Sequence, residues 1–123
     1  MTPLRVKRVY EPSSDGDGVR VLVDRLWPRG ISKEKAKIDL WLKDISPSDT
    51  LRKTYHAQPE KWEQFCSAYS ADLTAEPAVS ATKTLLELCK NGPVTLLYAA
   101  RDDERNNAVA LRDWLERTFK RRR

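Results

Sequence analysis

The residues best suited to ligand chemistry lie in one run, positions 24–30, which has the sequence DRLWPRG. The run begins near the end of a stretch, residues 19–26, whose alternating apolar side chains are typical of a β-strand. An arginine guanidinium presents a planar set of donors that matches a carboxylate or a phosphate, and a tryptophan ring can stack on a flat group. Open α/β sheets bind ligands at the carboxyl ends of their strands. We therefore expect this run to line a crevice for a small anionic ligand.

A structural role for the same side chains is an equally open alternative. In that interpretation Arg25 and Arg29 form ion pairs with carboxylates, and Trp27 belongs to the hydrophobic core. Asp24 and Asp102 are examples of such carboxylates. Ion pairs at loop junctions are common and need no ligand, so the sequence leaves both interpretations open.

A second group of polar residues follows the other clearly predicted strand, which ends at Tyr98. Tyr98 and Arg101 lie at the same edge of the sheet as the first run if the two strands are parallel. At the predicted start of the last helix, Asp102 favours helix capping over anion binding, because negative charge there repels a phosphate. Asn106 and Asn107 either direct their amides into the crevice or are exposed to solvent.

The predicted ligand-binding residues are cationic, aromatic or polar side chains that follow the strands or lie in the basic middle of the chain. They are Asp24, Arg25, Trp27, Arg29, Lys43, Arg52, Tyr98, Arg101 and Asn106. Whether the crevice also catalyses a reaction is a separate hypothesis, in which Asp24 or His56 acts as the base and the arginines stabilise negative charge. No phosphate-loop, Ser-His-Asp or zinc-protease motif occurs, and neither a metal ion nor a cofactor is predicted.

The net charge of +5, from 23 basic and 18 acidic residues, has two sources. Residues 120–123 hold four positive charges, so residues 1–119 carry only +1. Within residues 20–53, nine basic and five acidic side chains leave a surplus of +4. This surplus supports an alternative function, in which the middle segment and the C-terminal tail form a non-enzymatic module that binds nucleic acid or protein.

The length and composition predict one soluble domain, residues 1–119, with a basic C-terminal tail at residues 120–123. A chain of 123 residues has the size of a single domain, and 40% hydrophobic with 33% charged residues is typical of globular proteins. No apolar stretch approaches the roughly 20 residues of a membrane span, and the first residues lack the pattern of a signal peptide. A cytoplasmic location is therefore expected, in which Cys66 and Cys89 are buried thiols.

Local patterns predict strands over residues 4–10, 19–26 and 94–98, and leave residues 32–44 open between a helix and a strand. The last of these strands is a continuous apolar run, which is typical of a strand buried on both faces. The link between the first two strands is too short for a helical crossover. These strands therefore form a hairpin or are not neighbours.

Apolar spacing and capping residues predict four helices, with Ser48 capping the first and Pro59, Pro77 and Asp102 marking the starts of the others. A helix, a buried strand and a second helix in succession favour an α/β fold. We predict a small single-domain sheet of about three to four strands, at least partly parallel, that is packed with helices and includes a long C-terminal helix.

Four segments of the chain are familiar as a set: residues 7–12 (KRVYEP), 21–30 (VLVDRLWPRG), 41–48 (WLKDISPS) with 51–53 (LRK), and 95–100 (TLLYAA). In these segments the chain resembles the YeaO-like family, a branch of the uncharacterised domain of unknown function 488 group. The resemblance implies a compact, mostly bacterial and cytosolic α/β domain whose molecular function is not established, and it assigns no catalytic residue. It also implies a histidine in many relatives at the position of Asn107, where this chain has no group that transfers protons.

Overall fold

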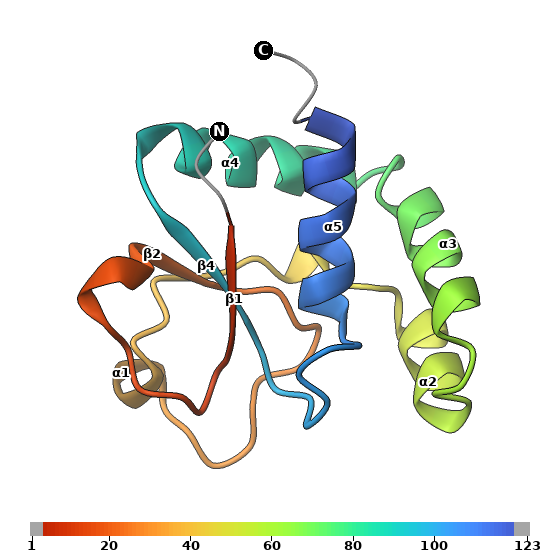
Figure 1. The fold of residues 1–123 in the computed structure, drawn as a ribbon, viewed down its shortest axis with the longest axis horizontal. Helices are drawn as coiled ribbons and strands as arrows, with labels where there is room; N and C mark the ends of the chain where they lie inside the picture. Colours follow the sequence, from red (N-terminus) through yellow and green to blue (C-terminus); the bar gives the residue numbers. More distant parts are fainter. Residues whose placement is uncertain (1–3, 120–123) are drawn as a thin grey trace.

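In the computed structural model, which describes residues 4–119, a four-stranded sheet is packed against helices (Figure 1). The strands are β1 (Arg5–Arg8), β2 (Val19–Leu22), β3 (Leu40–Trp41) and β4 (Val94–Tyr98). The α-helices are α1 (Lys33–Ala36), α2 (Asp49–Ala57), α3 (Trp62–Asp72), α4 (Ala78–Asn91) and α5 (Asn107–Phe119). Two 3₁₀ turns are η1 (Asp15–Asp17) and η2 (Lys43–Ile45).

The strands of the sheet are all parallel and follow the spatial order β1-β4-β2-β3. Thr95 of β4 aligns with Arg5 of β1 on one side and with Arg20 of β2 on the other. Strands β1 and β2 are therefore not neighbours, which is one of the two arrangements that the sequence left open. The predicted α/β class, strand number and long C-terminal helix are confirmed. Because the strands are parallel, their carboxyl ends share one edge of the sheet.

The pleat of the strands divides the apolar side chains between the two faces of the sheet. Val21 and Leu96 belong to the main core, which residues of α3, α4 and α5 complete. Leu22 and Leu97 belong to a smaller cluster on the other face, which Ala36 of α1 covers. All residues of β4 are buried, as predicted for a strand covered on both faces. Figure 1 shows α4 and α5 along the upper and right sides of the sheet and α1 at the lower left.

Helices α2 and α4 begin where local signals predicted them. Ser48 caps α2, because its side-chain oxygen accepts a hydrogen bond from the backbone N–H of Leu51 at 3.1 Å. Helix α4 starts directly after Pro77, and Gly92 follows its last residue, Asn91. Proline at the start and glycine at the end are each favoured by the backbone geometry of a helix terminus.

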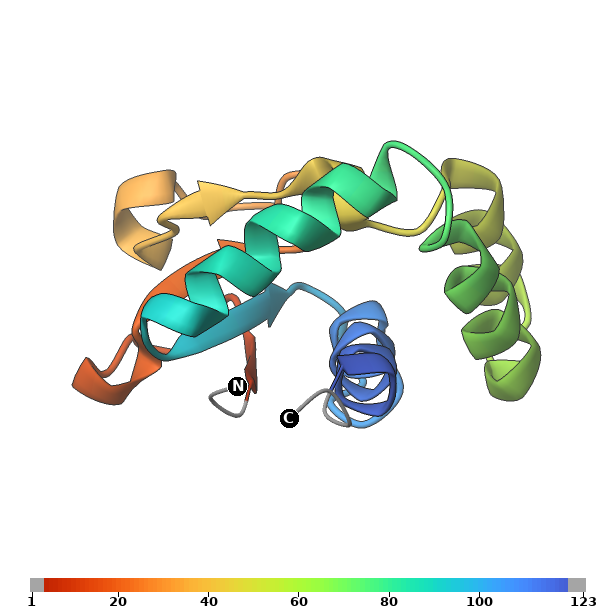
Figure 2. The same ribbon diagram turned by 90° about the horizontal axis from the view of Figure 1, so that it is seen from above.

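Helices α2 and α3 form a pair at one end of the molecule, held by aromatic contacts (Figure 2). Helix α3 begins at Trp62 rather than at Pro59, and it buries Phe65 and Tyr69 as its apolar stripe predicted. The ring of Phe65 stacks on Trp62 with 5.6 Å between centroids and lies 4.6 Å from the ring of Tyr55 in α2. The hydroxyl of Tyr69 donates a hydrogen bond to the backbone oxygen of Ile45, which ties α3 to η2.

Helix α5 begins at Asn107, so the start near Asp102 was wrong. The carboxylate of Asp102 accepts hydrogen bonds from the backbone N–H groups of Glu104 and Arg105, at 2.9 and 3.0 Å, and forms a separate turn before the helix. Asn106 caps the helix instead, because its side-chain oxygen accepts from the backbone N–H of Val109 at 2.9 Å.

The ambiguous segment 32–44 contains both a helix and a strand. Ser32 caps the single turn of α1, and Lys37 ends it with a left-handed φ of 52°. The chain then extends, and Leu40 and Trp41 pair with the end of β2 as β3. The segment therefore holds one helical turn and a two-residue strand, and the helix lies before the apolar residues whose spacing suggested it.

Cys66 lies in α3 and Cys89 in α4, and both are free thiols; Cys89 is buried and Cys66 is half-buried. Across residues 4–119, no helix has the length and apolar character needed to cross a membrane. The basic tail predicted at residues 120–123 lies outside the described residues.

Candidate functional site

Asp24 follows the end of β2 and is held in place from three sides. One carboxylate oxygen accepts a hydrogen bond from the backbone N–H of Ala99, just past β4, at 3.0 Å. The other accepts from the side-chain amide of Asn107, at the start of α5, at 2.9 Å. The indole N–H of Trp41 donates to the backbone oxygen of Asp24 at 2.7 Å. The carboxyl ends of β2, β3 and β4 therefore fix the position of one carboxylate.

Asn107 connects α5 to the sheet. Its amide nitrogen donates to the backbone oxygen of Val23 at 3.1 Å as well as to the Asp24 carboxylate. The sequence left open whether the pair of asparagines contributes to a crevice, and the structure separates their roles. Asn107 contacts Asp24, whereas Asn106 is only 2% exposed and uses its amide within its own turn. The sequence signal that was missed is that Asn107 directly follows the capping residue Asn106, which makes it the first residue of α5.

Arg52 in α2 lies near Asp24 without forming an ion pair with it. Its terminal nitrogen Nη2 donates to the carboxylate of Asp49, one turn earlier in the helix, at 2.9 Å. Its Nε is buried and has no hydrogen-bond partner among the described residues. Burial raises the pKa of Asp24 above its usual value, and this effect outweighs the hydrogen bonds from Asn107 and Ala99 and the charge of Arg52.

Arg25 reaches toward the start of α2 from the end of β2. Its Nε donates to the backbone oxygen of Pro47 at 2.9 Å, and this is the hydrogen bond that the half-buried side chain makes within residues 4–119. Pro47 is buried and directly precedes Ser48, the cap of α2. Arg25 and Arg52 therefore each bond to a residue next to Ser48, the cap of α2.

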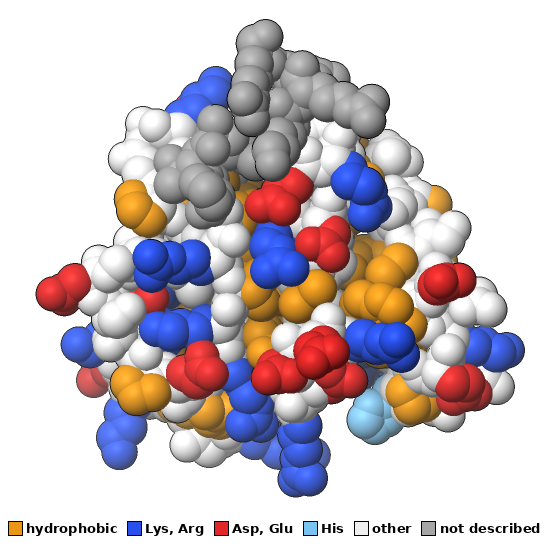
Figure 3. All heavy atoms as spheres, viewed as in Figure 1, with side chains coloured by type: hydrophobic (Ala, Val, Ile, Leu, Met, Phe, Trp, Pro, Cys, Tyr) orange, Lys and Arg blue, Asp and Glu red, His pale blue; other side chains and the backbone are white. Residues whose placement is uncertain are grey.

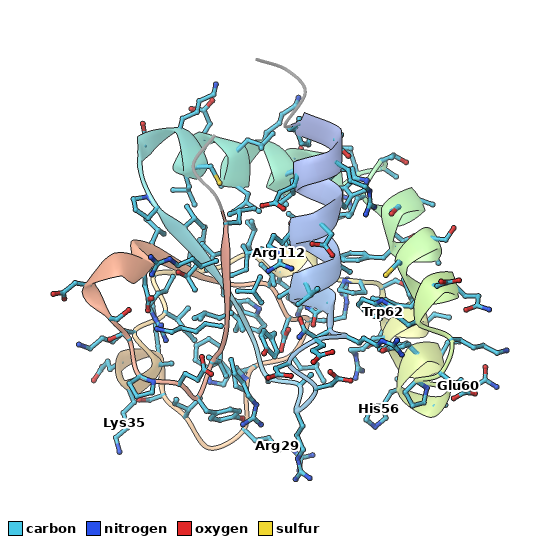
Figure 4. The ribbon with its side chains drawn as sticks, viewed as in Figure 1. Arg29, Lys35, His56, Glu60, Trp62 and Arg112 are labelled. Carbon is cyan, nitrogen blue, oxygen red and sulfur yellow. The ribbon has the colours of Figure 1, made fainter. Side chains whose placement is uncertain are left out.

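Trp27 and Arg29 lie in an outer loop. Trp27 is 36% exposed, packs edge-to-face on Trp41 with 5.4 Å between ring centroids, and donates its indole N–H to the backbone of Ile31. Arg29 is exposed, and its side chain points outward at the lower edge of the view in Figure 4. Gly30 then turns the chain with a φ of 73°. Trp27 is thus not a core residue, and neither Arg25 nor Arg29 forms an ion pair with a described carboxylate.

The other predicted site residues are dispersed. Lys43 is exposed, with its amino group 5.5 Å from the centroid of the Trp41 ring. Arg101 is exposed in the loop after β4, and Tyr98 is buried, which raises the pKa of its hydroxyl. His56, the second candidate base, is exposed in the last turn of α2 (Figure 4). Of the predicted set, Arg25 follows Asp24 in the chain, and Arg52 lies close enough to Asp24 for its charge to lower the pKa of that carboxyl group.

A second charged cluster, which the sequence did not reveal, surrounds Asp17 before the start of β2. Asp17 is 1% exposed and Arg20 is 3% exposed, and they form an ion pair at 2.7 Å. Lys7 of β1 donates to both Asp17 carboxylate oxygens at 3.0 Å. The guanidinium of Arg20 also donates two hydrogen bonds, from Nε and Nη2, to the backbone oxygen of Ala36. Burial opposes ionisation of Asp17, but hydrogen bonds from Ser14, Lys7 and Arg20 outweigh it and hold its pKa well below the usual range.

The described residues include no group of three or more histidine, cysteine, aspartate or glutamate side chains that is arranged to hold a metal ion. The chemistry that the Asp24 group offers is recognition by charge and hydrogen bonds. It combines two guanidinium groups, a carboxylate with a raised pKa and a side-chain amide.

Comparison with known proteins places the chain in a family. The model of the family described as the "Inactive DUF488-N3 subclade" matches residues 3–123. The uncharacterized protein YeaO of Escherichia coli is 43% identical over 112 residues, which cover 91% of this chain and 96% of the relative. Uncharacterized proteins of Mycobacterium bovis and Mycobacterium tuberculosis are each 42% identical over 110 residues, covering 89% of this chain and 91% of each relative. No solved structure matches the chain significantly. The chain therefore belongs to the inactive DUF488-N3 subclade, in agreement with its resemblance to the YeaO-like family.

Proposed function

We propose that this protein binds a small anionic ligand at the carboxyl ends of β2 and β4, with Arg25 and Arg52 as the cationic groups beside Asp24. The ligand class is a phosphate or carboxylate compound, such as a nucleotide. A guanidinium recognises these anions through pairs of parallel hydrogen bonds.

The observation that carries the proposal is the unused donor capacity of the two arginines. Nε of Arg52 is buried without an acceptor among residues 4–119, although a buried donor that lacks a partner costs roughly 1–3 kcal/mol. Nε of Arg25 donates a hydrogen bond to the backbone oxygen of Pro47, and the terminal nitrogens of Arg25 have no hydrogen-bond partner among the described residues. An oxygen of a bound anion would satisfy the terminal nitrogens of Arg25, and it would satisfy Nε of Arg52 once that side chain turns toward the anion.

The environment of Asp24 is compatible with an anion nearby. Burial raises its pKa, so this carboxyl group gives up its proton less readily than an ordinary aspartate, and a nearby anion would raise that pKa further. The hydrogen bonds from Asn107 and Ala99 fix the direction of its carboxyl group, so a ligand hydroxyl or a bound anion meets it in one geometry. Binding of an anion beside Asp24 is therefore expected to be accompanied by proton uptake.

The proposal is for binding and not for catalysis. The subclade to which the chain belongs carries the description "inactive". His56 is exposed and makes no hydrogen bond with Asp24, and Asn107 has no proton to exchange in a general acid–base step. The alternative of a nucleic-acid module built on the whole basic middle is less well supported, because Arg20 of that segment is buried in its ion pair with Asp17.

A thermal-shift experiment tests the proposal with inorganic phosphate, citrate and adenosine monophosphate as probes. A ligand at 100 times its Kd stabilises the folded state by about 2.7 kcal/mol, so at least one probe should raise the Tm by several degrees. Arg25→Ala and Arg52→Ala should each abolish most of this rise.

Arg117→Ala is the matched control. Arg117 is an exposed arginine in the last turn of α5, roughly 15 Å along the helix from Asn107 at 1.5 Å per residue. This variant should keep the full ligand-induced rise. The proposal is wrong if no probe raises the Tm of the parent protein, or if the rise survives in both Arg25→Ala and Arg52→Ala.

A further inference from the structure

The large apolar side chains that are exposed within residues 4–119 gather in two neighbouring loops. They are Tyr10, Leu26 and Trp27, which are 39%, 56% and 36% exposed. The hydroxyl of Tyr10 donates to the backbone oxygen of Arg29 at 2.8 Å, so the loop after β1 touches the loop after β2. Exposed aromatic residues that cluster at one place mark an interaction site more often than single exposed residues do.

Both rings are held in fixed positions. Tyr10 is anchored by its hydroxyl, and Trp27 is anchored by its indole N–H, which donates to the backbone oxygen of Ile31 at 2.9 Å. Trp27 also packs against Trp41. Because these bonds use the O–H and N–H donors, each side chain presents mainly its ring surface to a partner. A surface that is ordered before binding loses less conformational entropy when a partner binds.

The segment that carries Trp27 continues into a row of exposed cations. Residues 26–37 contain four basic side chains and one acidic side chain, Glu34, and all five are exposed. The basic residues are Arg29, Lys33, Lys35 and Lys37. None of the four forms an ion pair with any residue that the structure describes.

The same edge of the molecule carries further positive charge. Arg29 and Lys35 both lie at the lower edge of the view in Figure 4, and Figure 3 shows Lys and Arg side chains along that edge in the same view. The guanidinium of Arg8 lies 4.8 Å from the centroid of the Tyr10 ring. The two fixed rings therefore lie close to exposed positive charge, and Arg29, Lys33 and Lys35 form no ion pair with a described residue.

We propose that this aromatic-basic face, formed by Tyr10, Leu26, Trp27, Arg29, Lys33 and Lys35, binds single-stranded nucleic acid. Unpaired bases stack on aromatic side chains while a row of cations follows the phosphate backbone, and both parts are present here. A duplex conceals the faces of its bases, and an acidic peptide has no regular series of flat rings beside its charges. A single strand is therefore the partner whose chemistry matches both features.

This face is distinct from the small-ligand site. Arg25 is directed toward Pro47 and Arg52 toward Asp49, whereas the side chains of the aromatic-basic face belong to the outer loops and to α1. Either proposal can hold without the other. Their tests use different variants, so the results are separable.

Fluorescence anisotropy tests the proposal with the full chain and two labelled probes, a 12-nucleotide oligo-dT and a 12-nucleotide oligo-U, at low salt. Stacking of one base on an aromatic ring predicts that Trp27→Ala weakens binding by about tenfold. The double variant Lys33→Glu/Lys35→Glu should weaken it further and reduce the dependence of the affinity on salt, because fewer phosphates are neutralised.

The double variant Lys83→Glu/Lys90→Glu is the control, because it makes the same change in net charge at exposed positions of α4. Its affinity for each probe should stay within about threefold of that of the parent protein. Circular dichroism confirms that each variant is folded. Comparison of oligo-dT with oligo-U shows whether DNA or RNA is preferred.

Three results would overturn the proposal. The first is no saturable binding of either probe. The second is equal affinity for a duplex of the same length, or full competition by polyglutamate, because either result would show that binding depends on charge and not on base stacking. The third is unchanged binding in both Trp27→Ala and Lys33→Glu/Lys35→Glu. The proposal is equally wrong if these two variants bind normally and deletion of residues 120–123 abolishes binding.

Discussion

Asp17 and Asp24 stand at opposite ends of β2, and each is an aspartate with an arginine close by, yet their surroundings differ. Asp17 is almost fully buried and receives bonds from Lys7, Arg20 and Ser14, which hold its pKa well below the usual range. Asp24 receives bonds from neutral groups and has a pKa that burial raises.

The arginines differ in the same way. The donors of Arg20 are used within the protein, on Asp17 and on the backbone oxygen of Ala36. Arg52 keeps a buried Nε without a described acceptor, and Arg25 bonds through Nε alone. A charged cluster whose donors are all satisfied contributes to the fold, whereas one with unused donors is available to a ligand. The comparison therefore separates the positive charge that is bonded within the protein from the positive charge that we propose for binding.

The largest expected effect is on stability and belongs to the Asp17 cluster. Asp17→Asn removes the charge that compensates Arg20 and Lys7, and loss of one partner of a buried ion pair costs about 3–5 kcal/mol. Asp15→Asn, at an exposed position in the same turn, should change the free energy of unfolding by less than about 0.5 kcal/mol. Urea denaturation of both variants measures the difference. Similar losses in the two variants would show that the Asp17 ion pairs do not stabilise the fold.

A smaller effect distinguishes the two asparagines at the start of α5. Asn106→Ala removes a helix cap and should cost about 1 kcal/mol while leaving the pKa of Asp24 unchanged. Asn107→Ala should cost about 1–3 kcal/mol and raise the pKa of Asp24 further, because the amide that favours its ionised form is gone. Carboxyl-carbon NMR titration reports that pKa. If the two variants change it equally, Asn107 does not position Asp24.

The pH dependence of stability should have opposite signs at the two aspartates. The pKa of Asp17 is lower in the folded state than in the unfolded state, so its stabilising contribution is present above the unfolded value and is lost as the pH falls. Between pH 5 and pH 3 this loss is about 1 kcal/mol, and it should be absent in Asp17→Asn.

For Asp24 the folded-state pKa is the higher one, so its contribution is present at low pH and is lost as the pH rises through that value. Urea denaturation midpoints measured across a range of pH show the sign of the pH dependence that each aspartate contributes to stability. An acid-induced loss of equal size in the parent protein and in Asp17→Asn would contradict the assignment to Asp17.

The sequence predicted those parts of the fold that depend on local signals. Ser48, Pro77 and Gly92 marked helix ends because capping and backbone geometry act over a few residues. The apolar run of β4 predicted a buried central strand for the same reason. The start of α5 was missed because Asp102 and Asn106 are both good capping residues, and the choice between them depends on packing that local sequence does not encode.

The candidate site was predictable only in part. The run at residues 24–30 follows the carboxyl end of β2, as predicted, but its members separate into Arg25 beside Pro47 and an outer loop that carries Trp27. The contact of Asn107 with Asp24 depends on the strand order, because α5 follows β4 and β4 is the neighbour of β2. The burial of Arg20 was unpredictable because its partners come from η1 and from α1.

The most direct test of the difference between the two clusters is an NMR titration of the ¹⁵N-labelled protein with inorganic phosphate and with adenosine monophosphate, in which the arginine Nε–H signals are followed. We expect saturable shifts of the Arg25 and Arg52 Nε–H signals and of the backbone N–H of Ala99, because the bound anion lies beside these groups. The Nε–H signal of Arg20 should stay unchanged, because Arg20 is buried near the other end of β2. Shifts of Arg20 as large as those of Arg25 and Arg52, or no saturable shift of either, would contradict this expectation.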